Sequence, residues 1–258
     1  MKLDKDTSAV VCGGASGMGA ATVRALRDSR VKVAILDLNE ELGRKVAAET
    51  GATFFKIDVL DEDSVVRGFA AARAQQGQER ILVCTPGGGG MGYTAWRDAK
   101  TGEIRRHDFA RFSRIVALNL NGTFLCASVA SAGMMSLPVV AEEERGIIIL
   151  TSSTTSEDAP ARICAYAAAK AGINAMMLSM ARDLAPEGIR VNAILPGSFD
   201  TPLIADLPED FKTHMRNWNL LPKRFGKAEE YASLALELVR NAYINASIIR
   251  IDGGARAT

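Results

Sequence analysis

The feature that most constrains this chain is a regular alternation of short apolar runs with longer helical patterns. Seven apolar runs read as buried strands, at residues 8–12, 31–36, 53–57, 81–84, 146–150, 189–194 and 247–251. Strands separated by helices pair in parallel, because each crossover returns the chain to the same edge of the sheet. Parallel sheets are covered by helices on both faces. We therefore expect an α/β fold, a Rossmann-type doubly wound seven-stranded parallel sheet.

Length and charge fit a single domain without a nucleic-acid partner. The chain has 258 residues, is 48% hydrophobic and shows no internal repeat, so residues 1–258 fit a single domain with a large core. The formal net charge is +1 with acids and bases interspersed, which disfavours nucleic acid as a partner. The polar start is not typical of a signal peptide, and we find no apolar stretch that we expect to span a bilayer. We expect a cytoplasmic protein without a membrane partner.

The cysteines and histidines do not form a metal or disulfide pattern. Cys12, Cys84, Cys126 and Cys164 lie at wide spacings in apolar surroundings without a CxxC pair. We expect four buried thiols in a reducing compartment. The two histidines have no companion at ligand spacing, so we expect no metal site.

The first strand breaks into a glycine-rich turn. Gly13, Gly17 and Gly19 lie between this strand and a helical pattern that runs to about residue 29. Strand, glycine turn and helix form a phosphate cradle, because small residues let backbone N–H groups approach an anion at the positive end of the helix dipole. The spacing differs from GxGxxG, and a plain tight turn is the alternative.

Carboxylates end the second and third strands. Asp37 can accept hydrogen bonds from both hydroxyls of an adenosine ribose and would repel a 2′-phosphate, which favours NAD over NADP. No arginine stands in the glycine turn to bind such a phosphate. Asp58 can face the adenine amino group. The alternative for both residues is that each caps the helix that follows it. For Asp37 this helix begins near Asn39.

The stretch from Leu150 to Lys170 carries groups suited to proton transfer. Tyr166 and Lys170 are four residues apart and share one face if this segment is helical. A cation beside a phenol favours the phenolate and would lower the phenol pKa toward working pH. Ser153 follows a buried strand and can supply a hydroxyl to the phenol. A chance pair of Tyr and Lys on a helix is the alternative.

Three further segments are candidates for binding. Asn119 lies within a long helical pattern from about residue 108 to 135, either as a satisfied core group or as the anchor of a water. Residues 92–107 read as an extended loop with basic residues that either meet substrate phosphates or face solvent. Residues 198–224 read as a helical flap over the substrate, with core packing as the alternative. Its apolar residues are Leu203, Phe211, Met215, Trp218 and Leu220. Thr201, at the start of the flap, can receive a nicotinamide carboxamide.

Together these residues resemble the short-chain dehydrogenase/reductase family over essentially the whole chain. The resemblance rests on Gly13-x3-Gly17-x-Gly19, Asp37, Asp58, Asn119, Ser153, Tyr166-x3-Lys170, Pro196-Gly197 with Thr201, and the terminal Asp252-Gly-Gly. It implies an NAD-dependent interconversion of a secondary alcohol and a ketone by Asn119, Ser153, Tyr166 and Lys170. It also implies a homotetramer. The cofactor-binding residues it implies are Gly13, Ser16, Gly17, Met18, Gly19, Asp37, Leu38, Asp58, Val59, Gly87, Tyr166, Lys170, Pro196, Gly197 and Thr201.

The family's usual Asn-Asn-Ala-Gly after the fourth strand is replaced by Cys84-Thr-Pro-Gly87. An asparagine that would brace the sheet is therefore absent, which affects the expected cofactor geometry more than the chemistry. A narrower resemblance rests on an insertion after Gly90 and, mostly in the carboxyl-terminal third, on residues 181–191, 196–203, 207–209, 230–232 and 249–252. In these stretches the chain is similar to the type 2 short-chain 3-hydroxyacyl-CoA dehydrogenases, which also accept hydroxysteroids. That similarity implies an apolar secondary alcohol or acyl-CoA as substrate. A hydroxysteroid substrate and a non-catalytic NAD-binding regulatory protein are the alternatives.

Overall fold

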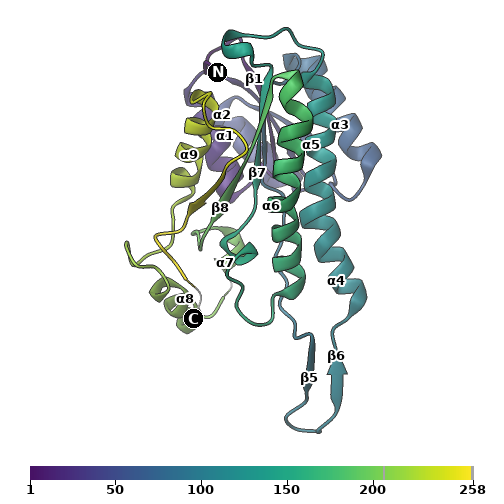
Figure 1. Ribbon diagram of the computed structural model, residues 1–258, viewed down its shortest axis with the longest axis vertical. Coiled ribbons are helices and arrows are strands. Elements are labelled where there is room, and N and C mark those ends of the chain that lie inside the picture. Colours follow the sequence, from purple (N-terminus) through teal and green to yellow (C-terminus); the bar gives the residue numbers. More distant parts are fainter. Residues whose placement is uncertain (206, 257–258) are drawn as a thin grey trace.

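The computed structural model describes residues 1–205 and 207–256 as one parallel sheet between two layers of helices (Figure 1). The seven strands have the order β3-β2-β1-β4-β7-β8-β9 and every neighbouring pair is parallel, which confirms the predicted fold. The strands are β1 (Ser8–Cys12), β2 (Lys32–Asp37), β3 (Thr53–Lys56), β4 (Ile81–Cys84), β7 (Gly146–Thr151), β8 (Ile189–Pro196) and β9 (Ile248–Ile251).

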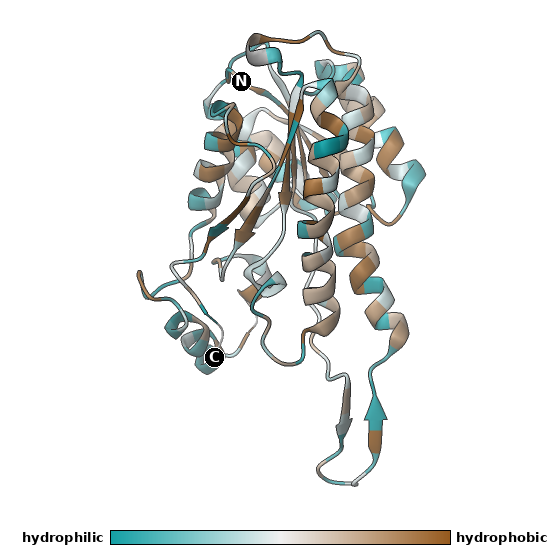
Figure 2. Ribbon diagram, viewed as in Figure 1, coloured by the Kyte–Doolittle hydropathy of each residue, from teal (hydrophilic) through white to brown (hydrophobic). Residues whose placement is uncertain are grey.

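Each strand sends alternate side chains to two separate cores. Val10 belongs to one hydrophobic cluster and its neighbour Val11 to the other, because successive side chains in a strand point to opposite faces. The first cluster is covered by α3 (Glu62–Gln76), α5 (Gly122–Met134) and α6 (Cys164–Leu184). The second is covered by α1 (Gly17–Asp28), α2 (Glu40–Thr50) and α9 (Ala228–Arg240). Figure 2 shows the resulting apolar strands between the helices.

The carboxyl edge of the sheet gathers the segments that carry the candidate site. The strand order reverses between β1 and β4, and ligands of doubly wound sheets bind at such a reversal. The glycine turn follows β1, Thr85 follows β4, and Ser152 and Ser153 follow β7. One edge therefore brings together residues that are far apart in the sequence.

The predicted long helix is interrupted by a π-helical segment. α4 (Phe109–Val116) leads into π-helical Ala117–Asn121 and then into α5, so Asn119 lies in the wider turn. Residues Phe109–Met134 reach a mean hydropathy of 1.5 over 18 residues, which suffices by length and composition to cross a membrane. The prediction that the chain holds no such stretch is therefore wrong. Cys126, Ala130 and Met134 are fully buried against the sheet, and core helices of this kind pass the same test.

A β-hairpin replaces the predicted extended loop at residues 92–107. β5 (Ala95–Arg97) pairs with antiparallel β6 (Ile104–Arg106), so that Trp96 stands opposite Arg105. Asp98 accepts hydrogen bonds from the backbone N–H groups of residues 100 and 101, and Gly102 has φ of 72°, a turn that brings the strands together. The hairpin projects from the end of the molecule below α4 (Figure 1).

The predicted flap forms two short helices whose ends are joined. α7 (Pro202–Ala205) and α8 (Glu209–Asn217) lie between residues 200 and 226, where Asp200 N–H donates to Gly226 O and Gly226 N–H donates to Ser198 O, each at 2.9 Å. Three of its apolar side chains are half-buried and Leu220 is exposed. The side chain of Leu203 lies outside the described part of the chain. Short 3-10 turns cover Ala141–Glu143, Thr154–Ser156 and Ala185–Glu187.

Three of the four cysteines are buried, and the prediction is wrong for the fourth. Cys12, Cys84 and Cys126 lie buried in the same hydrophobic cluster. Cys164, the first residue of α6, is exposed.

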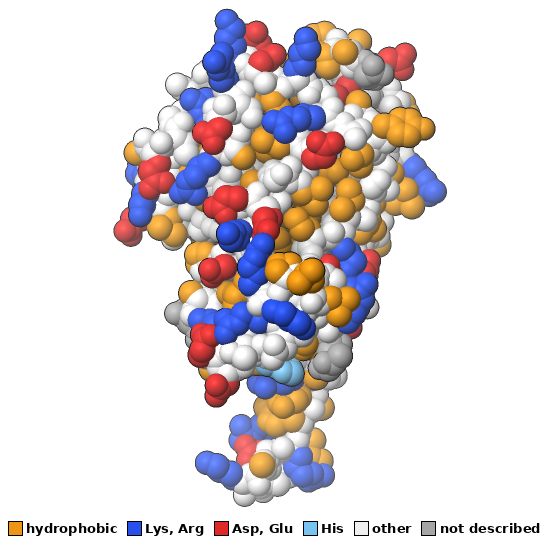
Figure 3. Space-filling model, turned by 90° about the vertical axis from the view of Figure 1, so that its left-hand side faces the viewer, with side chains coloured by type: hydrophobic (Ala, Val, Ile, Leu, Met, Phe, Trp, Pro, Cys, Tyr) orange, Lys and Arg blue, Asp and Glu red, His pale blue; other side chains and the backbone are white. Residues whose placement is uncertain are grey.

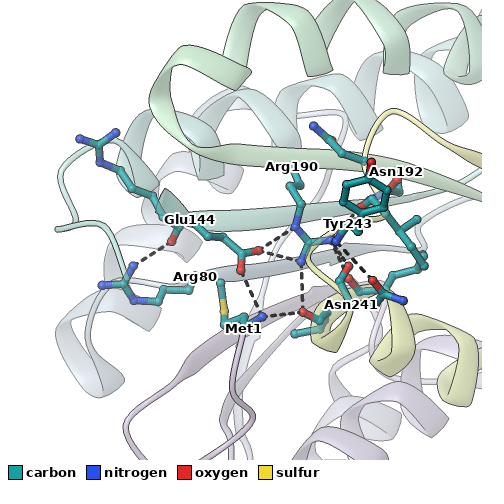
Figure 4. A network of polar contacts seen from close by, with 12 residues as sticks. Met1, Arg80, Glu144, Arg190, Asn192, Asn241 and Tyr243 are labelled. Carbon is teal, nitrogen blue, oxygen red and sulfur yellow. Dashed lines mark hydrogen bonds and ion pairs between the residues drawn. The ribbon is translucent and has the colours of Figure 1, made fainter. Parts of the chain in front are cut away.

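At the opposite, amino edge of the sheet, Arg190 of β8 joins several segments (Figure 4). Its guanidinium donates to the carbonyl oxygens of Leu238 at 2.7 Å and Ile244 at 2.8 Å, at the end of α9 and in the turn that follows. It also pairs with Glu144 at 2.7 Å, and that carboxylate lies 3.1 Å from the amino group of Met1. Arg190 and Glu144 are both more than nine-tenths buried.

Candidate active site

The glycine turn presents the unpaired N-terminus of α1 at the carboxyl edge. Gly13 has φ of 77° and Gly17 has φ of 50°, which is the region that glycine adopts without strain. Ser16 precedes the helix without making a side-chain cap, and the first turn of α1 contains no acidic residue. The first N–H groups of α1 are therefore left for another acceptor, which fits a phosphate.

Packing around the turn excludes larger residues. A Cβ atom on Gly19 would lie 2.1 Å from the carbonyl oxygen of Gly13, and one on Gly17 would lie 3.2 Å from the Thr201 side chain. Met18 lies half-buried between these two glycines. Thr201 therefore places the root of the flap directly against the turn, on the side where α1 begins.

Asp37 lies at the end of β2 beside the turn. Its carboxylate accepts hydrogen bonds from the N–H groups of Ala15 at 3.0 Å and Asn39 at 2.9 Å. Asn39, not Asp37, caps α2, by accepting from Leu42 N–H at 3.0 Å. The alternative of Asp37 as the helix cap is therefore excluded, and the carboxylate keeps acceptor capacity for hydroxyl groups. The adjacent Leu38 side chain is 59% exposed.

Asp58 and Val59 follow β3 at the same edge. Asp58 accepts from Leu60 N–H at 2.9 Å, whereas Asp61 is the residue that caps α3. Val59 packs against Gly122 so closely that a Cβ on this glycine would lie 2.8 Å from its side chain.

Pro196 and Gly197 end β8 near the flap. Gly197 N–H donates to Ile251 O at 3.0 Å, and a Cβ at this position would meet the Asp252 side chain at 2.7 Å. The turn after β8 is therefore fixed against the carboxyl end of β9.

Ser153 and Tyr166 come together from β7 and α6. The Ser153 oxygen accepts a hydrogen bond from the Thr155 hydroxyl at 3.0 Å. Burial raises the pKa of the Tyr166 phenol, and the nearby Ser153 hydroxyl lowers it by a smaller amount. This direction differs from the lowered pKa predicted from the sequence, because spacing along a helix does not reveal how far burial disfavours a phenolate.

Lys170 is buried behind the tyrosine. Its Nζ donates to the backbone oxygen of Thr151 at 2.9 Å and lies 5.6 Å from the centre of the Tyr166 ring. The side chain is 3% exposed, and burial lowers its pKa to about 8. The predicted helical face is therefore present, with the ammonium beside the phenol ring.

Asn119 is tied to the loop that follows β4. Its Nδ2 donates to Gly88 O at 3.0 Å and Ile115 O at 2.9 Å, and its Oδ1 accepts from Gly88 N–H at 3.3 Å. The amide is thus paired with protein groups, as predicted for a core residue. Gly87 lies between this amide and Lys170, since a Cβ on it would be 2.6 Å from Asn119 Oδ1 and 3.4 Å from Lys170 Nζ.

Three contributors were missed from the sequence. Thr151 holds the lysine through a backbone oxygen, and the Ser152 hydroxyl donates to Lys170 O at 2.8 Å. The Thr85 hydroxyl contacts the carbonyl oxygens of Cys12 and Gly13. Their positions in the sequence could have identified them, because each of the three stands at or directly after the carboxyl end of a strand.

The gathered groups fit a dinucleotide and a reacting alcohol. The turn and α1 suit the diphosphate, Asp37 suits a ribose diol, and Lys170 with Tyr166 and Ser153 suits the reacting end. A buried phenol beside an ammonium and a hydroxyl can exchange a proton with an alcohol or carbonyl oxygen.

Comparison with known proteins agrees with this chemistry. A family model described as Enoyl-(Acyl carrier protein) reductase matches residues 13–256. The chain is 34% identical to 3-hydroxyacyl-CoA dehydrogenase type-2 of Drosophila melanogaster, over 98% of each chain. It is 35% identical to the human protein of that name, over 98% of this chain and 96% of the other. A crystal structure of 3-hydroxyacyl-CoA dehydrogenase type-2 from Mycobacterium avium superposes with a TM-score of 0.91 at 36% identity, covering 100% of this chain and 99% of that one.

Proposed function

This chain belongs to the short-chain dehydrogenase/reductase family, and from that premise we propose that it is an NAD-dependent 3-hydroxyacyl-CoA dehydrogenase. It is an oxidoreductase that acts on a secondary alcohol and uses a nicotinamide cofactor. The observation that carries the substrate proposal is the full-length similarity to relatives named for 3-hydroxyacyl-CoA.

Support for NAD comes from Asp37. Its two carboxylate oxygens face the glycine turn and the start of α2, where a ribose diol would be bound and a 2′-phosphate would be repelled. No arginine stands between residues 13 and 19 or directly after Asp37. We expect NADH to bind more tightly than NADPH, by at least about tenfold, which a fluorescence titration of both would measure.

In the proposed mechanism each side chain has one role. Tyr166 removes the hydroxyl proton of the substrate, Ser153 donates a hydrogen bond to the same oxygen, and Lys170 stabilises the phenolate by its charge. When bound, NAD supplies the acceptor for the hydride that leaves the carbinol carbon. Lys170 would hold a ribose hydroxyl with the N–H groups that it does not donate to Thr151.

Substitution of the phenol tests this assignment. We expect Tyr166→Phe to lower kcat by at least about a thousandfold, because the ring remains while the proton acceptor is lost. NADH affinity should stay within about twofold of the wild-type value. Substantial turnover by this variant would show that another group is the base.

The substrate proposal is tested by a screen of NADH formation. We expect NADH formation with short and branched 3-hydroxyacyl-CoA thioesters. Hydroxysteroids are a competing arm of the same assay, and enoyl thioesters are a competing arm in which consumption of NADH is measured instead. Turnover confined to a competing arm would replace the substrate. Silence with every alcohol, while NADH still binds, would favour a regulatory protein.

We also propose that the protein is a homotetramer. Exposed apolar side chains lie on two separate sides of the molecule. One set lies on α4, α5 and α6, with Phe109, Phe124 and Leu178 as members. The other lies near β9 and the flap, with Leu221, Tyr243 and Ile248 as members. Figure 3 shows hydrophobic side chains gathered on the face that includes α9. Two different self-complementary faces generate a closed tetramer.

A further inference from the structure

Thr85 is the first residue after β4, and its side chain contacts the glycine turn. Its hydroxyl lies 2.9 Å from Cys12 O and 3.0 Å from Gly13 O, and its backbone N–H also donates to Cys12 O at 2.9 Å. One hydroxyl proton is therefore shared between two successive carbonyl groups of the chain that enters the cradle. In the family's usual Asn-Asn-Ala-Gly, asparagines stand at the positions of Cys84 and of this threonine.

The hydroxyl also fills the space that the two outer glycines leave open. A Cβ on Gly13 would lie 2.6 Å from Thr85 Oγ1, and one on Gly19 would lie 2.7 Å from the same atom. Real Cβ contacts are not that short, so the threonine hydroxyl fits here only because residues 13 and 19 are glycines. The oxygen is thus enclosed by both ends of the turn.

Holding these carbonyl groups fixes two peptide planes. The C=O of one residue and the N–H of the next belong to one planar trans peptide and point in opposite directions. Cys12 O points to Thr85, and the N–H of Gly13 accordingly points the other way, to Leu36 O at 2.8 Å. The same geometry at Gly13 O sets the direction of the next N–H in the turn.

The loop that begins with Thr85 is also fixed at its far end. The backbone of Gly88 exchanges two hydrogen bonds with the Asn119 amide, at 3.0 Å and 3.3 Å. Residues 85–88 therefore form a strut between the phosphate cradle and the helix that carries Asn119. Pro86, whose ring restricts φ, removes part of the remaining freedom of this strut.

We propose that Thr85 is a positioning residue for the dinucleotide. It does not contact the reacting atoms. Its hydroxyl holds the entry of the glycine turn in the conformation that presents backbone N–H groups to the diphosphate. The residue acts on cofactor affinity and leaves the proton-transfer groups in place. This inference rests on the nicotinamide site and is independent of which alcohol the enzyme oxidises.

The test compares three variants of matched shape. Thr85→Val keeps the volume and removes the hydroxyl, whereas Thr85→Ser keeps the hydroxyl. Thr22→Val is the control, because Thr22 is a fully buried threonine of α1 whose hydroxyl donates to Met18 O at 2.8 Å without touching the entry of the turn. The dissociation constant of NADH is measured by fluorescence, and KM for NAD and kcat are measured with the best substrate.

We expect Thr85→Val to raise the NADH dissociation constant and KM for NAD by about five- to tenfold, with kcat within about twofold of wild type. Thr85→Ser and Thr22→Val should bind NADH as the wild type does. The proposal is overturned if Thr85→Val binds NADH normally, or if Thr22→Val weakens binding equally. It is also overturned if kcat falls while affinity is kept.

Two further outcomes have defined meanings. If Thr85→Val does not fold, Thr85→Ser and Thr85→Ala decide: normal affinity in the serine variant with weakened affinity in the alanine variant supports the proposal, and equal affinity in both overturns it. If no 3-hydroxyacyl-CoA is oxidised while the variants still differ in NADH affinity, the substrate proposal fails and this one stands.

Discussion

At the scale of single residues, Lys170 shows a conflict between stability and function. Burial lowers its pKa from the ordinary value of 10.5 to about 8, and only one of its donors has a protein partner among the described residues, the backbone oxygen of Thr151. An ammonium in this position is useful for stabilising a phenolate and is costly to the folded chain. The cost depends on pH in a way that can be measured.

We expect Lys170→Met to be inactive and more stable than the wild type at pH 7. Between pH 10.5 and about 8 the unfolded chain binds a proton that the folded protein does not, so stability falls as pH falls through this window. Below about pH 8 the cost is constant. Removing the lysine should raise the free energy of unfolding at pH 7 by about 1–3 kcal/mol. The lost hydrogen bond to Thr151 offsets part of this gain.

Urea denaturation at pH 7 and pH 10.5 measures this difference. The gain should shrink at the higher pH, where the lysine is neutral in the folded protein and has lost its proton in about half of the unfolded chains. Lys32→Met is a matched control, because Lys32 is exposed on β2 and should show no such dependence. A Lys170→Met protein that is less stable than wild type at pH 7 would contradict the argument.

The sequence predicted which candidate side chains lie together better than it predicted their environment. Tyr166 and Lys170 are four apart, and this spacing places them on one side of α6. The partner that holds Lys170 is a backbone oxygen of Thr151, and a backbone oxygen is carried by every residue type. No sequence pattern could therefore have identified it. The raised pKa of the Tyr166 phenol likewise depends on burial, which follows from tertiary packing.

At the scale of elements, the strands that the sequence predicted are those with continuous apolar runs. β1, β4, β7 and β8 are buried along their whole length, so hydrophobicity alone identifies them. β5 and β6 have three residues each, and five of these six side chains are exposed. Such a hairpin is held by its turn and backbone hydrogen bonds, and it lacks the apolar run that marks a strand.

The end of α9 depends on an element distant in sequence. Arg190 of β8 donates to four backbone oxygens, of Leu238, Val239, Asn241 and Ile244, and so satisfies carbonyl groups that a helix end leaves unpaired. Its ion pair with Glu144 is buried, and loss of Arg190 would leave that buried carboxylate with the amino group of Met1 as its charged partner.

We expect Arg190→Met to lower the free energy of unfolding by about 3–5 kcal/mol. The control is Arg24→Met, which removes an ion pair with Glu49 at 2.8 Å between half-exposed side chains and should cost at most about 1 kcal/mol. Denaturant titrations of both variants give the comparison. Adding Glu144→Gln to the arginine variant should recover part of the loss, and no recovery would show that the helix end, rather than the stranded carboxylate, dominates.

At the scale of the whole molecule, the order of the strands in the sheet brings the parts of the candidate site together. The sheet reverses its order between β1 and β4, and the segments after β1, β4 and β7 meet at that edge although they lie about 140 residues apart in sequence. The strut of residues 85–88 connects the two halves of this site. Alternation of strands and helices was sufficient to predict the edge, whereas the contacts across it required the folded structure.

The number of subunits is also a property of the whole molecule. A tetramer of this 27.5 kDa chain would measure about 110 kDa by light scattering after size-exclusion chromatography. Phe124 on α5 is 52% exposed, so Phe124→Glu would place a charge inside the interface that we propose on α4, α5 and α6. We expect this variant to form a dimer of about 55 kDa, since the interface near β9 is left intact. Leu42→Glu changes an exposed leucine of α2, which belongs to neither face, and should remain a tetramer. A wild-type protein that elutes as a monomer would show that the exposed side chains of α5 and β9 do not form these interfaces.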